Sequence, residues 1–533
     1  MDANSRTREG GRWDPSGAPP HHGLGEGRRR QHPREPVHEA AQAVIPTPEG
    51  IPAALAEELA GVALAAATAA GARFAEVRVV KRDREALDLR DGALDRRRVD
   101  RDLGVAVRAL VADGWGHAGT NLLSRDGVAR AAAQAVMAAR ATAATARYPV
   151  ALPPALDVTY TTPLARDPFG VALADKVAPF AAAHDVMLSV AGVTGARGTA
   201  LFQAQETWLF TTGGGRGHQR VVLSGGGITA IAKRGDEVQT RSAPKAVEGN
   251  VLQGGFELVD AMNLPGEAQR VADEAVLLTR AAPLPAGDKT VILAGSQLSL
   301  QIHESVGHPT ELDRALGEEI SLAGASFLLP EQLDQLRFGS DRVNLTADAT
   351  TPTGPGTFGF DDEGTPATRT PLVEQGRFVG YLSGRDAAAR LGRPSAGALR
   401  AESWEHLPIV RMINVNLEPG EGSLADLVAG VDDGVLLDVN KSWSIDDLRL
   451  NFQFGCELAY AIRGGRLTGD IYKNPVYTGV TPRFWGDCSG VAGPEAWRVW
   501  GWSYCGKGDP VQLMYVGHGC APARFERVSV RST

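Results

Sequence analysis

The sequence predicts an α+β fold, with an N-terminal antiparallel sheet flanked by helices and a larger strand-rich C-terminal domain that carries a metal site. Short runs of β-forming residues separated by glycine turns recur in both halves. Ala-rich segments with helical periodicity stand between them. Two histidines enclosing a glutamate follow an apolar strand past the middle of the chain. The 533 residues, 43% of them hydrophobic, are enough for two or three packed cores.

The composition predicts a tail and two domains. Residues 1–45 are rich in Gly, Pro, His and Arg without periodicity, so we expect a disordered tail to which no function is assigned. Residues 46–285 are expected to form an N-terminal α+β domain, with a possible internal linker at 148–163, where proline occurs four times. Residues 286–533 are expected to form the C-terminal domain.

The N-terminal domain should begin with a helix over Ile51–Ala70, which Glu57 and Glu58 mark as a surface helix and Gly71 ends. Short β-rich runs then predict an antiparallel sheet. The expected strands cover 75–80, 86–89, 104–111 and 114–118, and further strand pairs lie between 193 and 232 with glycine turns at 213–215 and 225–227. The other expected helices cover 122–142, 171–188 and 267–280.

The C-terminal domain should begin with the apolar strand Thr290–Ala294, which turns at Gly295 into a helical stretch. From about residue 343 the chain is turn-rich and strand-dominated. Residues 374–376, Glu-Gln-Gly, predict a hairpin between strands at 369–373 and 377–382.

The bulk properties exclude several classes of protein. A formal net charge of −8 provides no basic surface, so we expect no nucleic-acid partner. The four cysteines all lie late in the chain and form no close pair, unlike a secreted disulfide framework. No apolar run resembles a signal peptide or is long enough to span a bilayer. We therefore expect a soluble, cytoplasmic protein without membrane contact.

The motif His303-Glu-Ser-Val-Gly-His308 has the composition of a hydrolytic zinc site, but its spacing is HExxxH. On an ideal helix, residues four apart lie about 40° apart, whereas residues five apart lie about 140° apart, too far for one metal. The helix must therefore distort near His308. Gly307 provides backbone freedom there, and Pro309 cannot donate the next helical hydrogen bond, so a wide turn or helix end would let the histidines converge.

Two histidines near a helix end are by themselves more often ordinary surface or core residues. Two further residues favour a metal centre here: Glu304, adjacent to a candidate ligand as a general base would be, and Cys456, a late soft ligand in Phe-Gly-Cys-Glu. Glu311 is the main competitor for the third ligand position, because acidic residues follow the histidines in many zinc hydrolases. We rank it below Cys456.

Other motifs have both a functional and an ordinary interpretation. The triplet Asp361–Glu363 is either a substrate-amine site or a solvated turn. Arg411 and Asn414 either line a substrate groove or face solvent. Lys507 lies between two glycines but lacks the spacing of a phosphate loop. The late tryptophans favour core packing over a subunit contact or peptide platform: Trp485, Trp497, Trp500 and Trp502.

The HExxxH motif followed by Cys456 resembles the active-site pattern of TldD/PmbA proteins, a family also known as modulators of DNA gyrase. The similarity covers about residues 50–530 and includes 75–78, 361–364, 411–414, 474–475 and 505–508. Pro309-Thr310, in place of a glycine-rich continuation, and the N-terminal tail depart from the pattern. The resemblance implies zinc held by His303, His308 and Cys456, with Glu304 activating water that attacks a peptide carbonyl.

The resemblance further implies a dimer that encloses the site and admits flexible or unfolded peptides in extended form. The partner would be a second copy or a related TldE/PmbA-like subunit. A non-catalytic partner subunit or peptide-binding module is the alternative, and a degraded motif would identify it. His303, Glu304, His308 and Cys456 are all present, so the prediction is a zinc-dependent peptidase. A gyrase-associated regulator finds no support in the acidic charge balance.

Overall fold

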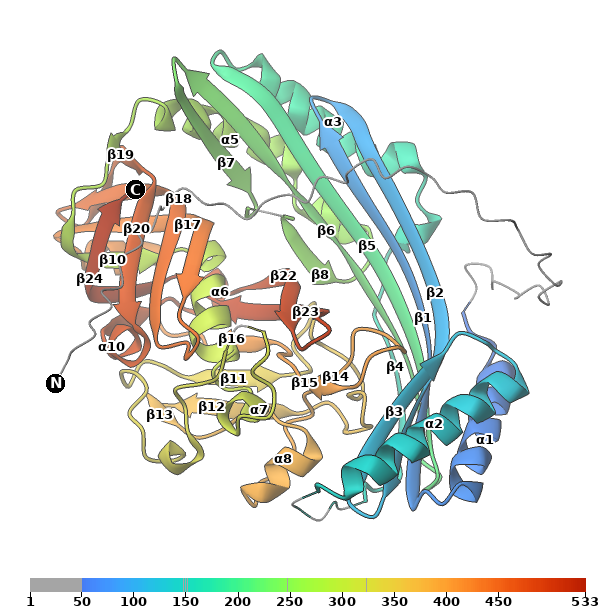
Figure 1. Cartoon of the computed structure of the whole chain (residues 1–533). Helices are drawn as coiled ribbons and strands as arrows, with labels where there is room; N and C mark the ends of the chain where they lie inside the picture. The colour runs from blue at the N-terminus through green and yellow to red at the C-terminus, as the bar shows by residue number, and fades with distance from the viewer. Residues whose placement is uncertain (1–49, 147, 149, 151, 247, 323) are drawn as a thin grey trace, which may run out of the picture. The chain divides into compact units, whose positions relative to one another are not determined.

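The computed structural model describes residues 50–533 except 147, 149, 151, 247 and 323, and these residues belong to one compact unit (Figure 1). The predicted tail at 1–45 lies outside the described residues. The α+β class is confirmed, with an antiparallel sheet in the N-terminal part and a strand-rich C-terminal part. The division at 285/286 stays a prediction. In the described part of the chain, no helix is long and apolar enough to cross a membrane.

The N-terminal sheet has eight strands in the order β3-β2-β1-β5-β6-β4, with β7 and β8 also paired to β6. All pairings are antiparallel except β4 with β6. The strands are β1 Phe74–Arg90, β2 Ala93–Val111, β3 Gly114–Thr120, β4 Asp157–Thr161, β5 Val193–Thr211, β6 Arg216–Arg234, β7 Glu237–Ala243 and β8 Asn250–Gln253.

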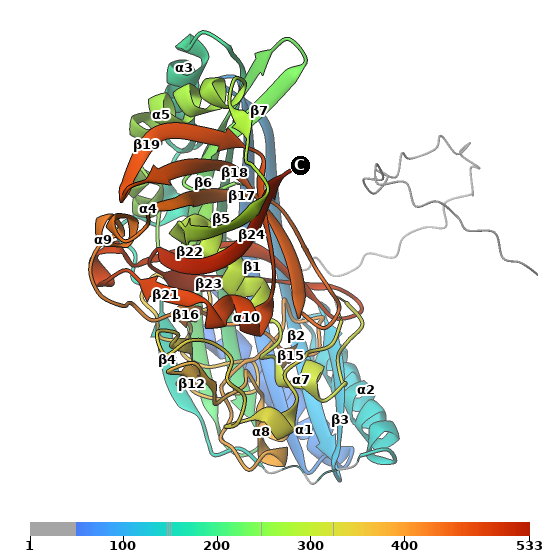
Figure 2. The same ribbon diagram turned by 90° about the vertical axis from the view of Figure 1, so that its left-hand side faces the viewer.

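Two groups of helices cover one face of this sheet, one group near each end (Figures 1 and 2). One end carries α1 Ala53–Ala69 and α2 Arg125–Ala143, and the other carries α3 Leu173–Ser189, α4 Glu257–Ala261 and α5 Leu264–Leu278. Each group buries its own apolar core against the strands. The four long helices confirm the predicted ones to within a few residues at each end.

Side chains of β1 alternate between the two faces, as a strand requires. Val77 and Val79 pack under α1 and α2, and Leu87 packs under α3 and α5. The opposite face carries Arg78 and Arg82, which form ion pairs with Asp362 and Glu402 of the C-terminal half. This face of the sheet therefore anchors the part of the chain that holds the histidine motif.

Two predictions for the N-terminal half need correction. The runs 75–80 and 86–89 are one continuous strand, because the charged residues between them find partners: Lys81 pairs with Asp83, and Glu85 with Lys176. Glycines 225–227 form no turn and lie inside β6, where a Cβ on Gly225 would come within 2.1 Å of the Asn250 carbonyl oxygen. The possible internal linker at 148–163 stays a prediction, and its later part contains β4, which pairs with β6.

The second large sheet closes on itself. Strand β17 pairs with both β10 and β18, so the path β17-β10-β24-β20-β18 returns to its start, while β19 and β9 extend it and β21 pairs with β24. The strands are β9 Ala282–Pro283, β10 Gly287–Leu293, β17 Asp433–Ile445, β18 Asn451–Arg463, β19 Arg466–Lys473, β20 Pro475–Val480, β21 Cys488–Val491 and β24 Ala523–Ser532. The strand predicted at 290–294 corresponds to β10.

Smaller elements complete the C-terminal half. They are β11 Leu345–Asp348, β12 Arg369–Glu374, β13 Arg377–Phe378, β14 Leu399–Arg400, β15 Ile409–Val410, β16 Val415–Leu417, β22 Arg498–Lys507 and β23 Gln512–Cys520, with helices α6 Gly295–Ile302, α7 Leu312–Ala315, α8 Arg385–Arg390, α9 Leu424–Ala429 and α10 Thr481–Gly486. The predicted hairpin is present as β12–β13, with Gln375 and Gly376 at positive φ in its turn. Helix α6 is buried throughout and carries the histidine motif at its end.

Candidate metal centre

The two histidines of the motif converge because the helix widens between them. Helix α6 ends at Ile302, and His303–Gly307 continues as a π-helical turn in which the His308 amide donates to the His303 carbonyl over 3.2 Å. An i→i+5 bond stacks residues five apart one turn above each other. The imidazole centroids are 4.9 Å apart. The predicted distortion is thus confirmed, and a Cβ on Gly307 would clash with Met412 Sδ at 2.1 Å.

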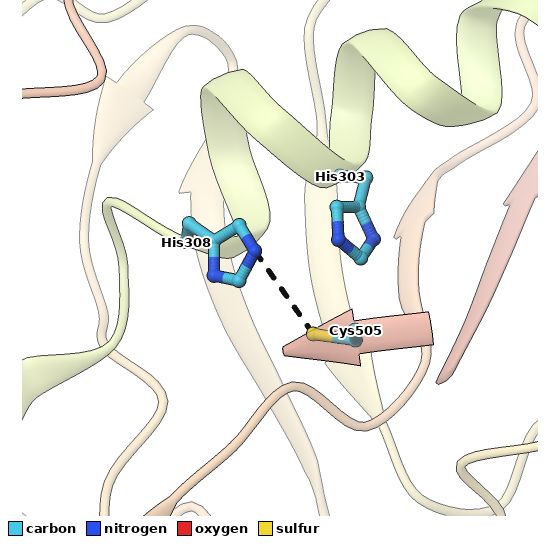
Figure 3. Close-up of side chains that lie close together, drawn as sticks. All are labelled: His303, His308 and Cys505. Carbon is cyan, nitrogen blue, oxygen red and sulfur yellow. Dashed lines mark hydrogen bonds between the residues drawn. The ribbon is translucent and has the colours of Figure 1, made fainter. Parts of the chain in front are cut away.

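Cys505 of β22 joins the two histidines (Figure 3). The pairing of β22 with β23 shifts between Trp502 and Cys505, a bulge of the kind that re-aims a side chain. The Cys505 Sγ lies 3.9 Å from His308 Nε2. One donor atom from each of the three residues lies within 4.8 Å of the other two, and all three residues are buried. This N, N, S set suits a soft or borderline divalent metal.

Cys456, the third ligand that the sequence analysis selected, does not belong to this group. It lies in the interior of β18, opposite Asn440 of β17. Burial and the neighbouring Asp438 and Glu457 raise the pKa of the Cys456 thiol well above its usual value. At Cys505, burial also opposes ionisation, but His308 and Arg411 outweigh it and lower the pKa. A metal needs a thiolate, so Cys505 is the better donor on both position and charge.

A hydrogen-bond chain sets the tautomer of His303. His518 Nδ1 lies 2.9 Å from the Val415 carbonyl, which can only accept, so this nitrogen carries a proton. Burial, with His303 beside it, holds the pKa of His518 well below its usual value, so its Nε2 keeps a lone pair. His303 Nδ1 lies 2.9 Å from that Nε2 and donates to it. The Nε2 of His303 is thereby left with a lone pair for a metal.

His308 is oriented by a carboxylate on its far side. Its Nδ1 donates to Glu311 Oε2 over 3.0 Å, which leaves Nε2 facing Cys505. Burial raises the pKa of Glu311, but Lys507 and Arg314 outweigh it and hold the pKa well below its usual value. Arg314 Nε is 2.7 Å from the same carboxylate oxygen. Glu311, the competing ligand in the sequence analysis, therefore orients His308 as an outer partner.

Glu304 lines the same small pocket as His303 and Cys505. It is 6% exposed, and its Oε2 accepts a hydrogen bond from Arg449 of the β17–β18 connection. The pocket wall also includes Leu300, Trp443, Trp502 and Tyr504. A carboxylate in an apolar pocket beside candidate metal ligands is placed as a general base requires.

The remaining candidates have structural partners. The triplet 361–363 is buried: Asp361 accepts backbone amides of Thr365 and Leu399, and Asp362 pairs with Arg78. Arg411 and Asn414 neither line a groove nor face solvent, since both are fully buried and bond to backbone groups. Their contacts connect the strands around the centre.

Trp485, Trp502 and Lys507 have contacts at or near the candidate centre. Trp485 is buried and donates to Ser305 Oγ in the π-helical turn over 2.9 Å, in line with the preferred core interpretation. Trp502 reaches the pocket wall, with its ring 5.9 Å from that of His303. Lys507 is fully buried against Asp313, which excludes a phosphate-loop role.

Comparisons with known proteins identify the family of the chain. The sequence profile of the PmbA/TldA metallopeptidase C-terminal domain matches residues 286–531, and that of domain 1 of the same family matches residues 75–139. The chain belongs to the PmbA/TldD family. The resemblance inferred from the HExxxH motif is confirmed, and so, through the family, is the prediction of a metallopeptidase.

Curated relatives match most or part of the chain. A metalloprotease of Synechocystis is 26% identical over 86% of this chain and 95% of its own length, and one of Methanothermobacter thermautotrophicus is 27% identical over 86% and 96%. A zinc metalloprotease TldD homolog of Saccharolobus solfataricus is 27% identical over 34% of this chain and 39% of its own.

Two solved structures share the PmbA/TldD fold at 16% identity. A putative modulator of a DNA gyrase from Thermotoga maritima covers 89% of this chain and 99% of its own with a TM-score of 0.68. TldE from Thermococcus kodakarensis covers the same shares with a TM-score of 0.65.

Sequence reasoning missed three residues of the candidate centre: Cys505 beside the two histidines, and His518 and Arg449 as partners of His303 and Glu304. Cys505 was available as one of four cysteines, but choosing between them needs the strand arrangement. His518 is a single histidine more than two hundred residues after His303, and Arg449 lies in a charged turn. No spacing rule distinguishes either residue from an ordinary polar one.

Proposed function

We propose that this chain is a zinc-dependent peptidase that hydrolyses flexible or unfolded peptides, with zinc held by His303, His308 and Cys505. The observation that carries the proposal is the convergence of these three donors beside Glu304. Both imidazoles use Nδ1 to bond an outer partner, which leaves their Nε2 lone pairs to the interior of the site. The donor set and the tautomers fit zinc, which the name of the Saccharolobus relative also mentions.

Zinc bound at such a site would act as a Lewis acid: it would polarise a peptide carbonyl and make water easier to deprotonate. Glu304 takes a proton from the attacking water and later returns it to the leaving amine as the C–N bond breaks. Arg449 holds one carboxylate oxygen of Glu304 in place. His518 and Glu311 keep the imidazoles in their metal-binding tautomers.

The proposed substrate is an extended peptide, because the pocket is small and largely apolar beside Glu304. Extended chains bind by backbone hydrogen bonds and demand little side-chain identity. We further propose a dimer, either of two copies or with a related TldE-like subunit, which the fold shared with a TldE structure supports. A non-catalytic partner subunit is the alternative, and the complete set of donors plus Glu304 argues against it.

The test compares the wild type with Glu304→Gln on an unstructured fluorogenic peptide, with zinc content measured in parallel. We expect Glu304→Gln to retain zinc and to cleave the peptide at least about 100-fold more slowly than the wild type, because the substitution removes the base and no ligand. Glu311→Gln is the matched control, and we expect it to lower zinc affinity instead. Cleavage by zinc-loaded Glu304→Gln at the wild-type rate would refute the mechanism.

A further inference from the structure

A buried lysine faces the pocket of the proposed zinc site. Lys245 lies between β7 and β8, is 5% exposed, and lines the pocket together with His303, Glu304 and Cys505. Its ammonium stands 4.0 Å from the centroid of the Trp502 ring. A buried ammonium normally has acceptors for its three N–H groups. Within the described residues, none lies within hydrogen-bond distance of Lys245 Nζ, so the aromatic ring is its principal partner.

Glu248 lines the same pocket and is the carboxylate whose charge acts on Lys245. It does not form an ion pair with Lys245 within 4.0 Å in the described structure. Burial raises the pKa of Glu248 to about 7 and lowers that of Lys245 to about 8. Glu248 therefore carries only part of its charge near neutral pH, and the positive charge of Lys245 is incompletely balanced inside the pocket.

A peptide whose scissile carbonyl lies beside His303, Glu304 and Cys505 comes next to Lys245, because these four residues line one pocket. An ammonium without acceptors in such a place recognises an anionic oxygen, and the charge-assisted bond is stronger than a neutral one. We infer that Lys245 is a substrate-binding residue that receives a carboxylate of the peptide. This inference rests on the proposed peptidase function.

The carboxylate has two possible sources in a peptide, its C-terminus or an Asp or Glu side chain. Labelled peptides of one neutral sequence separate these sources. One has a free C-terminus and one has a C-terminal amide. A series of further amidated peptides carries a single Asp, at a different position in each. Binding to full-length, zinc-loaded Glu304→Gln is measured by fluorescence anisotropy, so that no cleavage is needed.

We expect at least one carboxylate peptide to bind about 10-fold more tightly than the neutral amide. In the Glu304→Gln background, Lys245→Met should abolish this preference while leaving the affinity for the neutral amide and the zinc content unchanged. Lys245→Arg should retain it. Lys441→Met is the control for loss of a lysine charge, because this exposed lysine already bonds Gln239 and Asn474 and should not affect the preference.

Tighter binding of the peptide with a free C-terminus would identify the C-terminal carboxylate as the group that binds Lys245. Tighter binding of an Asp peptide would identify a side-chain carboxylate instead. Equal binding of all peptides, or a preference that survives Lys245→Met, overturns the inference. Wild-type enzyme that cleaves peptides without any carboxylate preference would refute only this inference. If Lys245 binds the carboxylate but the wild type cleaves no peptide, the peptidase proposal is refuted and the carboxylate-binding role of Lys245 still holds.

Discussion

His303 and His518 are joined by a 2.9 Å hydrogen bond between Nδ1 of His303 and Nε2 of His518. The Val415 carbonyl fixes the proton of His518 on Nδ1, and the bond therefore presents the Nε2 lone pair of His303 to the metal position. His518 is thus a positioning residue for His303, a proposed metal donor that lies 215 residues away in sequence.

The first prediction removes this acceptor. His518→Phe keeps a ring of similar size but leaves His303 Nδ1 without a partner, so both its tautomer and its orientation become free. We expect zinc affinity, measured by competition with a chelator, to fall about 10- to 100-fold. His117→Phe, at a histidine remote from the centre, should leave the affinity unchanged. An unaltered affinity in a folded His518→Phe variant would contradict the role assigned to His518.

The second prediction distinguishes the two candidate thiols. Cys505→Ser and Cys456→Ser remove one buried sulfur each, so their packing effects are comparable. We expect Cys505→Ser to lose zinc and peptide cleavage together, because it removes a donor. Cys456→Ser should keep about one zinc per chain in elemental analysis. The opposite pattern would restore Cys456 as the third ligand.

The third prediction concerns the pH dependence of zinc binding. Burial lowers the pKa of His303 and of His308 to about 4, so both imidazoles are already neutral above about pH 5 and release no proton to the metal. Only the Cys505 thiol then loses a proton on binding. Between pH 5 and the pKa of that thiol, the logarithm of the affinity should rise with pH at a slope of about one. A slope near three would contradict neutral histidines.

The fourth prediction concerns the buried ion pair behind His308. Lys507 donates to Asp313 Oδ1 and Oδ2 over 2.6 and 2.8 Å and to the Val410 carbonyl over 2.7 Å. Lys507→Met leaves a buried carboxylate uncompensated, so we expect the free energy of unfolding in urea to fall by about 3–5 kcal/mol. Lys507→Met combined with Asp313→Asn should lose less than the single variant. A double variant that loses the sum of the Lys507→Met and Asp313→Asn losses would show that the pair is not coupled.

Part of the centre could be predicted from sequence because its determinants are local. The five-residue spacing of His303 and His308 excludes a regular α-helix, and Gly307 with Pro309 indicates where the helix must change. The π-helical turn is the resulting structure. Long periodic segments such as α1 and α2 were predicted for the same reason, since their apolar faces repeat within a few residues.

Errors in the N-terminal sheet arose where long-range partners decide the outcome. The charged middle of β1 looks like a break, yet Glu85 lies within the strand because Lys176 of α3 supplies its counter-ion. The glycines at 225–227 look like a turn, yet they permit the close approach of neighbouring backbones.

By itself, the sequence determined the family, the α+β class, the two histidines and the adjacent Glu304, because these depend on residue types at short spacings. Only the tertiary structure shows that Cys505, and not Cys456, lies beside the two histidines. Cys505 reaches His308 across 197 residues through a bulge in β22, while Cys456 stays inside β18 among carboxylates that disfavour its thiolate. A donor set is defined by proximity and local charge, and both arise only when distant strands pack together.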